Sequence, residues 1–266
     1  MNIKTRPIEY KDGKTNCIGY LAWDDNRADP LPCVLINHAW GGLDSFAMDK
    51  AVQMAALGYV GFALDNYGDG ALPETADDKA AMMTPLKEDR AALLKRLKAG
   101  YNAAAKLDEV DETHMAAIGY CFGGLCTLDM ARAGLDLHAA VSFHGLLDAP
   151  EGLPKKKCKA SVLACHGWDD PMATPDTSKL LAKKWPQRIA TGKFMLMAAL
   201  SIALPIRRPM IKNPARFIMK PLTSVQQMQC LTSSQRNFQC TELIKLSEYY
   251  SRYGRAARLL RCSPRP

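Results

Sequence analysis

The chain has 266 residues, 48% of them hydrophobic, so it is long enough to bury a sizeable core as one α/β domain or two small ones. It has no run of 18 apolar residues, and residues 1–6 lack the apolar stretch of a signal peptide, so we expect neither a membrane-spanning helix nor secretion. The nine cysteines form no CxxC pair and no zinc-ligand cluster. They are typical of reduced thiols in a cytoplasmic protein, and they imply no metal or organic cofactor.

The net charge of +8 is distributed unevenly. Residues 187–266 hold 14 of the 35 basic residues but only two of the 27 acidic ones, Glu242 and Glu248, so this segment carries about +12 and residues 1–186 about −4. The segment also lacks Asp, His, Trp and any regular apolar period. The composition therefore predicts an ordered domain over residues 1–186 and a basic tail of low order over residues 187–266.

Short apolar runs alternate with amphipathic segments through the first 186 residues. In chain order the pattern predicts a strand over 33–37, a helix over 46–57, a strand over 59–64, a turn over 65–70, a helix over 86–105, a strand over 115–118, a helix over 125–133, and strands over 139–143 and 161–165. Apolar strands separated by helices indicate an α/β fold, in which a mostly parallel sheet is covered by helices on both faces. Ligands of such sheets bind at the carboxyl ends of the strands.

The hexapeptide over residues 119–124, GYCFGG, is the strongest catalytic signal in the chain. It fits the G-x-S-x-G nucleophile elbow of α/β-hydrolases, with Cys121 in place of the serine. Gly119, Gly123 and Gly124 would avoid clashes around a nucleophile whose backbone is strained. We expect the thiol at the carboxyl end of a strand, where the helix N-terminus favours the thiolate. A buried structural cysteine in a glycine-rich turn is the alternative.

Two turns after other predicted strands could complete a hydrolase site. Asp170 has the best spacing for the carboxylate that orients a general base, with Asp169 second, and an Asp pair that only caps a turn is the alternative. The loop containing Ala39 and Trp40 resembles the one that lends a second amide to an oxyanion hole. We therefore expect the N–H groups of Phe122 and of Ala39 or Trp40 to hold the oxyanion.

The general base is missing from its expected place, because in this fold it follows the acid along the chain. All of the histidines precede Asp170; they are His38, His114, His138, His144 and His166. His38 is expected to orient its loop, and His114 and His138 to lie on the surface or in loops. His144 closes a strand and could face the pocket, although a hydrogen-bonded structural role is the simpler interpretation. Aromatic residues near strand ends suggest an apolar pocket but are as often core; these are Trp40, Tyr67, Phe122 and Trp168.

Five blocks of sequence resemble the dienelactone hydrolase family, in the right order over about residues 6–184. They are VLINHAWGGLD (34–44), LGYVGFALDNYGDG (57–70), IGYCFGG (118–124), VSFHGLL (141–147) and CHGWDDPMA (165–173). The resemblance implies an α/β-hydrolase fold. It also implies hydrolysis of a small-molecule lactone or carboxylic ester through an acyl-enzyme on a Cys-Asp-His triad. Cys121 and Asp170 fall on the positions of the nucleophile and the acid.

The chain departs from the family in two places. Ala39 stands where the best-studied members carry a Glu that helps to activate the thiol. Residues 187–266 lack the H-x-F-T-N-P block that holds the triad histidine, so we expect the last strand and helix to be missing or replaced. Codons after Trp185 can spell HCFTNP in a displaced frame, with its histidine straddling the codons of Ser201 and Ile202. A frameshift is therefore our hypothesis for the tail, and a chain without its base should hydrolyse negligibly and fold poorly.

Two other functions compete with this reading. A non-catalytic relative could use the basic tail to bind nucleic acid or an acidic partner, although the basic residues form no stripe and no known module, which makes nucleic acid the less favoured ligand. A thiol redox protein could pair Cys121 with Cys126, although residues five apart across a turn and a helix do not form a redox motif.

Overall fold

The structure is a computed structural model that describes residues 1–150, 157–167, 170, 172–174, 176–177, 181 and 195–197. All of these lie in one unit of the chain, Met1–Leu200. The predicted tail lies outside the described residues except for Met195–Met197, so its boundary and low order stay predictions. None of the helices in the described part has the length and apolar character that a membrane span requires.

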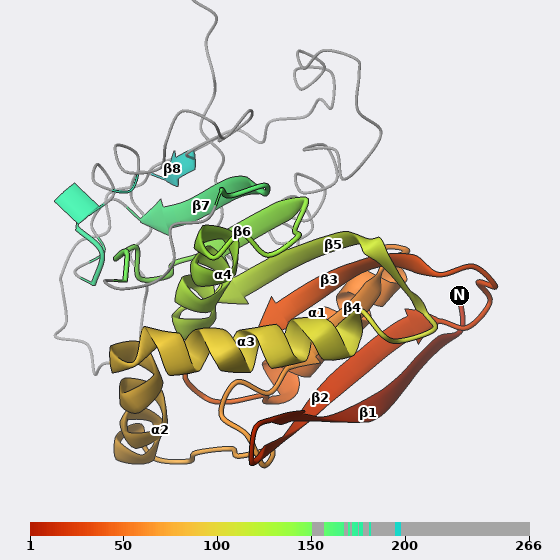
Figure 1. Cartoon of the computed structure of the whole chain (residues 1–266), viewed down its shortest axis with the longest axis horizontal. Coiled ribbons are helices and arrows are strands. Elements are labelled where there is room, and N and C mark those ends of the chain that lie inside the picture. The colour runs from red at the N-terminus through yellow and green to blue at the C-terminus, as the bar shows by residue number, and fades with distance from the viewer. Residues whose placement is uncertain are drawn as a thin grey trace, which may run out of the picture. The chain divides into compact units, whose positions relative to one another are not determined.

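A single sheet runs through the molecule, and in the described residues it has eight strands in the order β1-β2-β4-β3-β5-β6-β7-β8 (Figure 1). Their bounds are β1 Ile3–Asp12, β2 Thr15–Asp24, β3 Leu31–Asn37, β4 Val60–Leu64, β5 Val110–Tyr120, β6 Ala139–Phe143, β7 Ser161–Gly167 and β8 Met195–Met197. Pairing is parallel from β4 across to β8, and antiparallel for β1 with β2 and for β2 with β4. This confirms the predicted α/β fold with a mostly parallel sheet.

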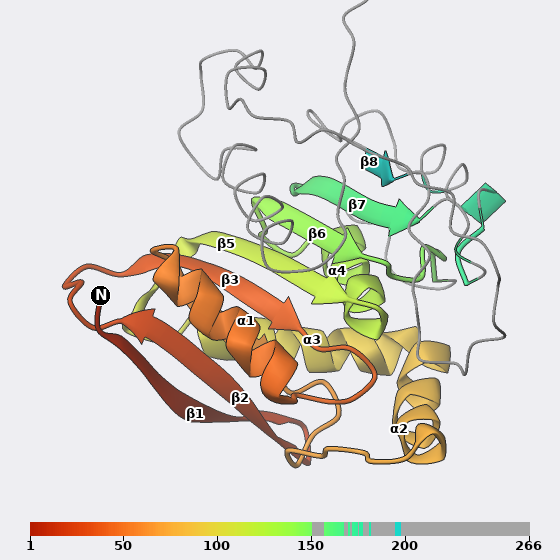
Figure 2. The same ribbon diagram turned by 180° about the vertical axis from the view of Figure 1, so that it is seen from behind.

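Helices cover both faces of the sheet. Their bounds are α1 Ser45–Ala56, α2 Ala76–Glu88, α3 Arg90–Ala104 and α4 Phe122–Arg132. The two opposite views show α3 and α4 on one face and α1 on the other (Figures 1 and 2). On the α1 side the packing is close enough that a Cβ at Gly61 would collide with the Ala51 backbone, which requires glycine on that strand.

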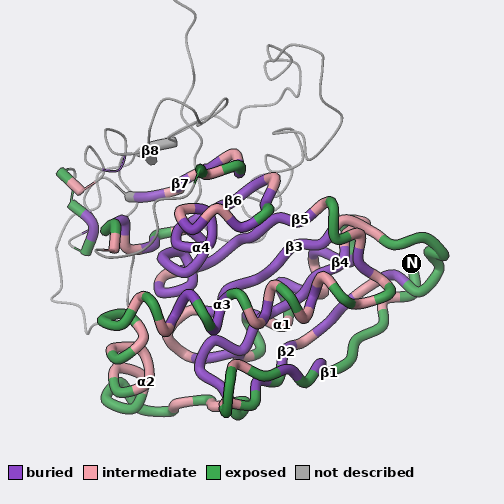
Figure 3. The backbone as a smooth tube through the Cα atoms, viewed as in Figure 1, coloured by how far each residue is buried: buried purple, intermediate pink, exposed green. Residues whose placement is uncertain are grey.

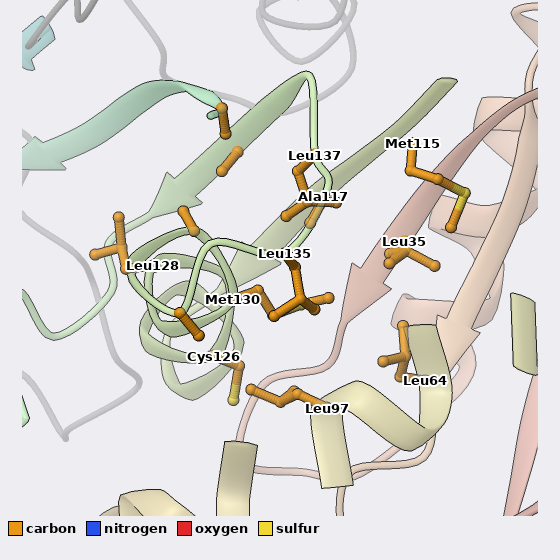
Figure 4. Packing of buried hydrophobic residues seen from close by; sticks show 14 of the residues in the cluster. Leu35, Leu64, Leu97, Met115, Ala117, Cys126, Leu128, Met130, Leu135 and Leu137 are labelled. Atoms are coloured by element: carbon orange, nitrogen blue, oxygen red, sulfur yellow. The ribbon is translucent and has the colours of Figure 1, made fainter. Parts of the chain in front are cut away.

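The core is concentrated in the central strands and in α4. The strands β3 to β6 run through the interior, whereas α2 has no buried residue (Figure 3). Leu35, Leu64 and Met115 of the sheet belong to the same buried apolar cluster as Leu97 of α3 and Met130 of α4 (Figure 4). Fully burying a side chain of this size contributes about 1.5–3 kcal/mol, so this layer fixes the helix that begins at Cys121.

Two parts of the fold differ from the sequence prediction. The hairpin of β1 and β2 was not predicted, because β1 buries only Ile8 and Tyr10 and so shows little apolar alternation. The single helix predicted over 86–105 is wrong: the chain breaks at Asp89, which ends α2 and caps α3 by accepting the Ala92 N–H at 2.9 Å. A carboxylate at this position satisfies one of the free amides of a new helix and therefore starts one.

The edge of the sheet after β7 is occupied by the short strand β8. Its three residues pair in parallel with the end of β7, from Cys165 opposite Met195 to Gly167 opposite Met197. The expectation that the last strand of the family is missing or replaced stays a prediction, because the chain after β8 lies outside the described residues. A helix after β8 would lie outside the described residues.

Candidate active site

Cys121 occupies a sharp turn between the central strand β5 and the helix α4. Its φ of +54° and ψ of −116° lie in a region that L-residues rarely adopt, and it forms the N-cap of α4. Its N–H donates to the Phe143 carbonyl at 3.0 Å, and its own carbonyl accepts from the Gly124 N–H at 2.9 Å. Backbone strain of this kind costs of order 1–3 kcal/mol and persists only where the surroundings enforce it.

Close contacts with neighbouring atoms require glycine at the three elbow positions. A Cβ on Gly119 would collide with the Gly123 carbonyl, and a Cβ on Gly123 would collide with the Asn37 carbonyl. A Cβ on Gly124 would stand 2.6 Å from the Ser142 hydroxyl oxygen. Side chains at these three positions would therefore push apart the turn at Cys121, β3 and β6.

The Cys121 thiol is partly exposed, and burial raises its pKa. The Phe122 N–H bonds to the sulfur and opposes this shift, whereas the nearby Asp170 carboxylate adds to it. The helix N-terminus was expected to favour the thiolate, and here burial outweighs it. The thiol is therefore protonated at neutral pH and needs a base before it can act as a nucleophile.

Asp170 lies in the turn after β7 and is 8% exposed. One carboxylate oxygen accepts the Met172 N–H at 2.8 Å, and the other lies 3.7 Å from His166 Nε2. Its charge reaches both Cys121 and His144. The neighbouring Asp169 and Trp168 are outside the described residues.

His166 was not singled out from the sequence, yet it organises the same turn. The side chain is buried, and Nε2 donates to the Ala173 carbonyl at 2.8 Å. Nδ1 has no hydrogen-bond partner among the described residues. Its place at the end of β7, directly before the G-x-x-D turn, was the one signal available in the sequence.

His38 holds the loop that was predicted to form one side of the oxyanion hole. The ring is buried, Nδ1 donates to the Ala39 carbonyl at 2.6 Å, and Nε2 accepts the Asn66 N–H at 3.1 Å. Burial lowers the pKa of His38, in agreement with a neutral ring whose tautomer follows from these bonds. The N–H groups of Ala39 and Trp40 have no hydrogen-bond partner among the described residues.

Tyr67 connects this loop to the elbow. Its hydroxyl donates to the Trp40 carbonyl at 2.9 Å, and its ring stacks on Phe122 with centroids 5.9 Å apart. The His38 ring meets it edge-on at 4.7 Å. These aromatic rings form a wall beside Cys121, and only Trp168 of the predicted pocket lies outside the described residues.

The turn that carries Tyr67 is built around the buried Asp65. The carboxylate accepts three backbone N–H groups, from Ile18 at 3.1 Å, Gly68 at 2.8 Å and Gly70 at 3.0 Å. Arg96 of α3 donates to the Tyr67 carbonyl at 2.7 Å. The sequence indicated a turn at this place but not the carboxylate that forms it.

His144 lies next to the elbow, whereas His114 and His138 do not. His144 follows β6, has a φ of +41°, and its N–H donates to the Cys165 carbonyl at 2.8 Å. His138 precedes the same strand and stacks on His114 with centroids 5.1 Å apart, at the amino end of β6 and so away from the elbow. His114 lies within β5 and is partly exposed, so of the two predicted settings, surface or loop, the loop is excluded for it.

No group of three or more His, Cys, Asp or Glu side chains in the described part of the chain is arranged to hold a metal ion. The six cysteines described are free thiols. Cys126 is buried within α4, and burial raises its pKa well above its usual range. A redox pair with Cys121 therefore has no support in this geometry.

Comparison with known proteins gives the family. The family model of the dienelactone hydrolase family matches residues 18–196, about two-thirds of the chain. The chain belongs to the dienelactone hydrolase family. Among solved structures, a dienelactone hydrolase-like promiscuous phosphotriesterase from metagenomic libraries is 32% identical, with a TM-score of 0.68, 74% of this chain and 82% of that chain covered. A protein designated m3DLH is 33% identical, with a TM-score of 0.67 and the same coverage.

Curated relatives of this dienelactone hydrolase family member match over shorter stretches. A Caenorhabditis elegans protein, "Uncharacterized protein K02A2.1", is 40% identical over 86 residues, 32% of this chain and 54% of that protein. A Bradyrhizobium protein named "Probable 2-oxo-3-(5-oxofuran-2-ylidene)propanoate lactonase" is 25% identical over 118 residues, 44% of this chain and 47% of that protein. The chain spans about half the length of the curated relatives that it matches.

Proposed function

We propose that this member of a hydrolase family cleaves small lactones or carboxylic esters through a thioester on Cys121. The observation that carries the proposal is the elbow itself: a partly exposed thiol in a strained turn, with the Phe122 N–H directed at its sulfur. A similar protein named as a lactonase supports the substrate class.

In the proposed reaction the Cys121 sulfur loses its proton to a base, and its electron pair attacks the carbonyl carbon. The carbonyl π pair moves to oxygen, where the amides of Phe122 and of Ala39 or Trp40 stabilise the charge. Each such donor contributes about 3 kcal/mol to lowering the barrier. Collapse of this intermediate expels the alkoxide, which takes up the proton. Water then cleaves the thioester to release the acid and the thiol.

Asp170 is proposed as the carboxylate that stabilises the protonated base. It is buried at the end of β7, fixed by the Met172 N–H, and its charge is felt at Cys121. The family places a histidine base after this residue, and the sequence has no histidine after Asp170. We therefore expect slow turnover.

The test is the reaction of the full chain with p-nitrophenyl acetate, with release of p-nitrophenol and the mass of the protein followed together. We expect an acetyl group on Cys121 and a slow turnover that is lost in Cys121→Ser. Cys126→Ser is the matched control, because this buried cysteine of the same helix has no access to substrate. Equal turnover by the two variants would exclude Cys121 as the nucleophile.

A further inference from the structure

His144 leaves the sheet directly beside Cys121. The strands β5 and β6 are parallel neighbours, and their last paired residues are Tyr120 and Phe143. Cys121 and His144 each follow by one residue, and the Cys121 N–H still bonds the Phe143 carbonyl at 3.0 Å. Neighbouring strands lie about 4.8 Å apart, so the two backbones emerge side by side at the carboxyl edge.

The backbone of His144, like that of Cys121, has a positive φ. Its φ is +41°, a left-handed conformation that non-glycine residues adopt in only a few per cent of cases. The chain then turns so that Gly145 packs against Gly124 in the first turn of α4, too closely for a Cβ on either glycine. The elbow and the turn at His144 are therefore packed against each other.

The His144 imidazole has no structural partner that would explain this strain. The residue is exposed, and within the described part of the chain its ring makes no hydrogen bond or ion pair. Among the residues that the structure describes, its ring contact is with Tyr120, at 6.4 Å between centroids and tilted by 52°. A histidine with a purely structural role would be expected to use its ring nitrogens.

The segment after His144 is fixed to the helix that begins at Cys121. Arg132 donates to the Leu147 carbonyl at 2.8 Å and to the Asp148 carbonyl at 2.9 Å. The fully buried Asp129 holds Arg132 at 3.0 Å and binds Arg90 through both of its oxygens, at 2.6 and 2.8 Å. The position of His144 is thus anchored by β6 on one side and by α4 on the other, as a preorganised site requires.

From this juxtaposition we propose that His144 accepts the proton of the Cys121 thiol in this chain, in place of a histidine after Asp170. The proposal rests on the proposed function, since it names the base of that same site. The neutral imidazole takes the thiol proton, and the sulfur electron pair forms the C–S bond. The imidazolium then gives the proton to the departing alkoxide. In the second half the imidazole takes a proton from water and returns it to sulfur as the C–S bond breaks.

The charges around His144 suit this role. Although the residue keeps part of its surface open to solvent, the chain packed around it partly desolvates the ring and lowers the pKa of His144, so the ring is neutral at pH 7 and ready to accept a proton. The Asp170 carboxylate opposes that shift and His166 reinforces it. Once the imidazolium forms, Asp170 is the group that stabilises it.

The first test measures Cys121 alone and needs no hydrolysis. Iodoacetamide modification would be followed from pH 5 to pH 10 by mass spectrometry of the Cys121 peptide. The variant is His144→Asn, because asparagine tolerates a positive φ, and the control is His138→Asn at the other end of β6. We expect His144→Asn to slow modification at pH 7 about tenfold and to move the inflection to higher pH. An unchanged profile would overturn the proposal.

The second test uses turnover of p-nitrophenyl acetate and chemical rescue. A general base contributes typically 10²–10⁴-fold, so we expect His144→Asn to lose at least about 100-fold and His138→Asn to stay within twofold. Free imidazole should restore part of the rate to His144→Gly, which fits the positive φ without strain. Circular dichroism would confirm that each variant is folded.

The two proposals can fail separately. An effect of His144 on Cys121 alkylation without turnover in any variant would support the pairing and reject the ester hydrolase. Turnover that depends on Cys121 but not on His144 would support the hydrolase and reject His144 as its base.

Discussion

The buried carboxylate of Asp65 provides a quantitative test of how the site is held together. It is 1% exposed, and its Oδ2 accepts two backbone N–H groups while Oδ1 accepts a third. In Asp65→Asn, the amide oxygen can keep the short bond to Gly68, but the amide NH₂ then faces the N–H groups of Ile18 and Gly70. Two charge-assisted hydrogen bonds are lost, and the amide NH₂ opposes the two backbone donors. Each lost bond lowers the free energy of unfolding by about 1.5–3 kcal/mol.

We therefore expect Asp65→Asn to lower the free energy of unfolding by about 3 kcal/mol and the melting temperature by roughly 6–12 °C. Urea unfolding at pH 7, with an unchanged m-value, is the measurement. The matched control is Asp69→Asn in the same turn, where the side chain is exposed and the φ of +54° suits asparagine. A difference below 0.5 kcal/mol between the two variants, on the order of the effect of a surface substitution, would refute this reasoning.

Three further predictions follow from the buried groups and from the tail. Asp129→Asn leaves the Arg90 and Arg132 charges without their shared carboxylate, so it should destabilise the fold by about 3–5 kcal/mol in urea unfolding, whereas Asp136→Asn on the surface should have little effect. Because burial lowers the pKa of His38, the folded state binds fewer protons than the unfolded state. Stability should therefore fall as the pH drops below about 6.5. The measurement is the urea midpoint of unfolding as a function of pH, and the same pH dependence in the unchanged chain and in His38→Gln would contradict this. Resequencing the codons from position 175 onward should reveal the HCFTNP block in a displaced frame, and its absence from all frames would end the frameshift hypothesis.

The fold and the strained turn at Cys121 could be predicted because short-range patterns determine them. The run before Gly119 is apolar on both faces, which marks a central strand, and the glycines at 119, 123 and 124 mark the only kind of turn that brings strand and helix so close. The hairpin of β1 and β2 escaped prediction because an edge strand buries few side chains. The break at Asp89 escaped it because Asp89 is both the last cap of α2 and the first cap of α3, so no linker separates the two helices in the sequence.

The supporting interactions of the site could not be predicted, because they join residues far apart in the chain. Arg90 and Asp129 are separated by 39 positions, and His38 and Asn66 by 28. Neither pair lies in a motif, and each depends on the packing of two elements that only the fold brings together. The raised pKa of Cys121 has the same origin, since helix geometry alone suggests a thiolate and the burial that opposes it is a tertiary effect.

The two contacts of Tyr67 have a consequence for any attempt to give this scaffold new substrates. One side chain holds both the loop that contains Trp40, by its hydrogen bond to the Trp40 carbonyl, and the ring of Phe122, by stacking on it. The effects of substitutions at Trp40 and at Phe122 on activity will therefore not add, because each substitution shifts the Tyr67 ring that contacts the other residue. A library that varies all three positions together should contain active combinations that stepwise mutation would never reach.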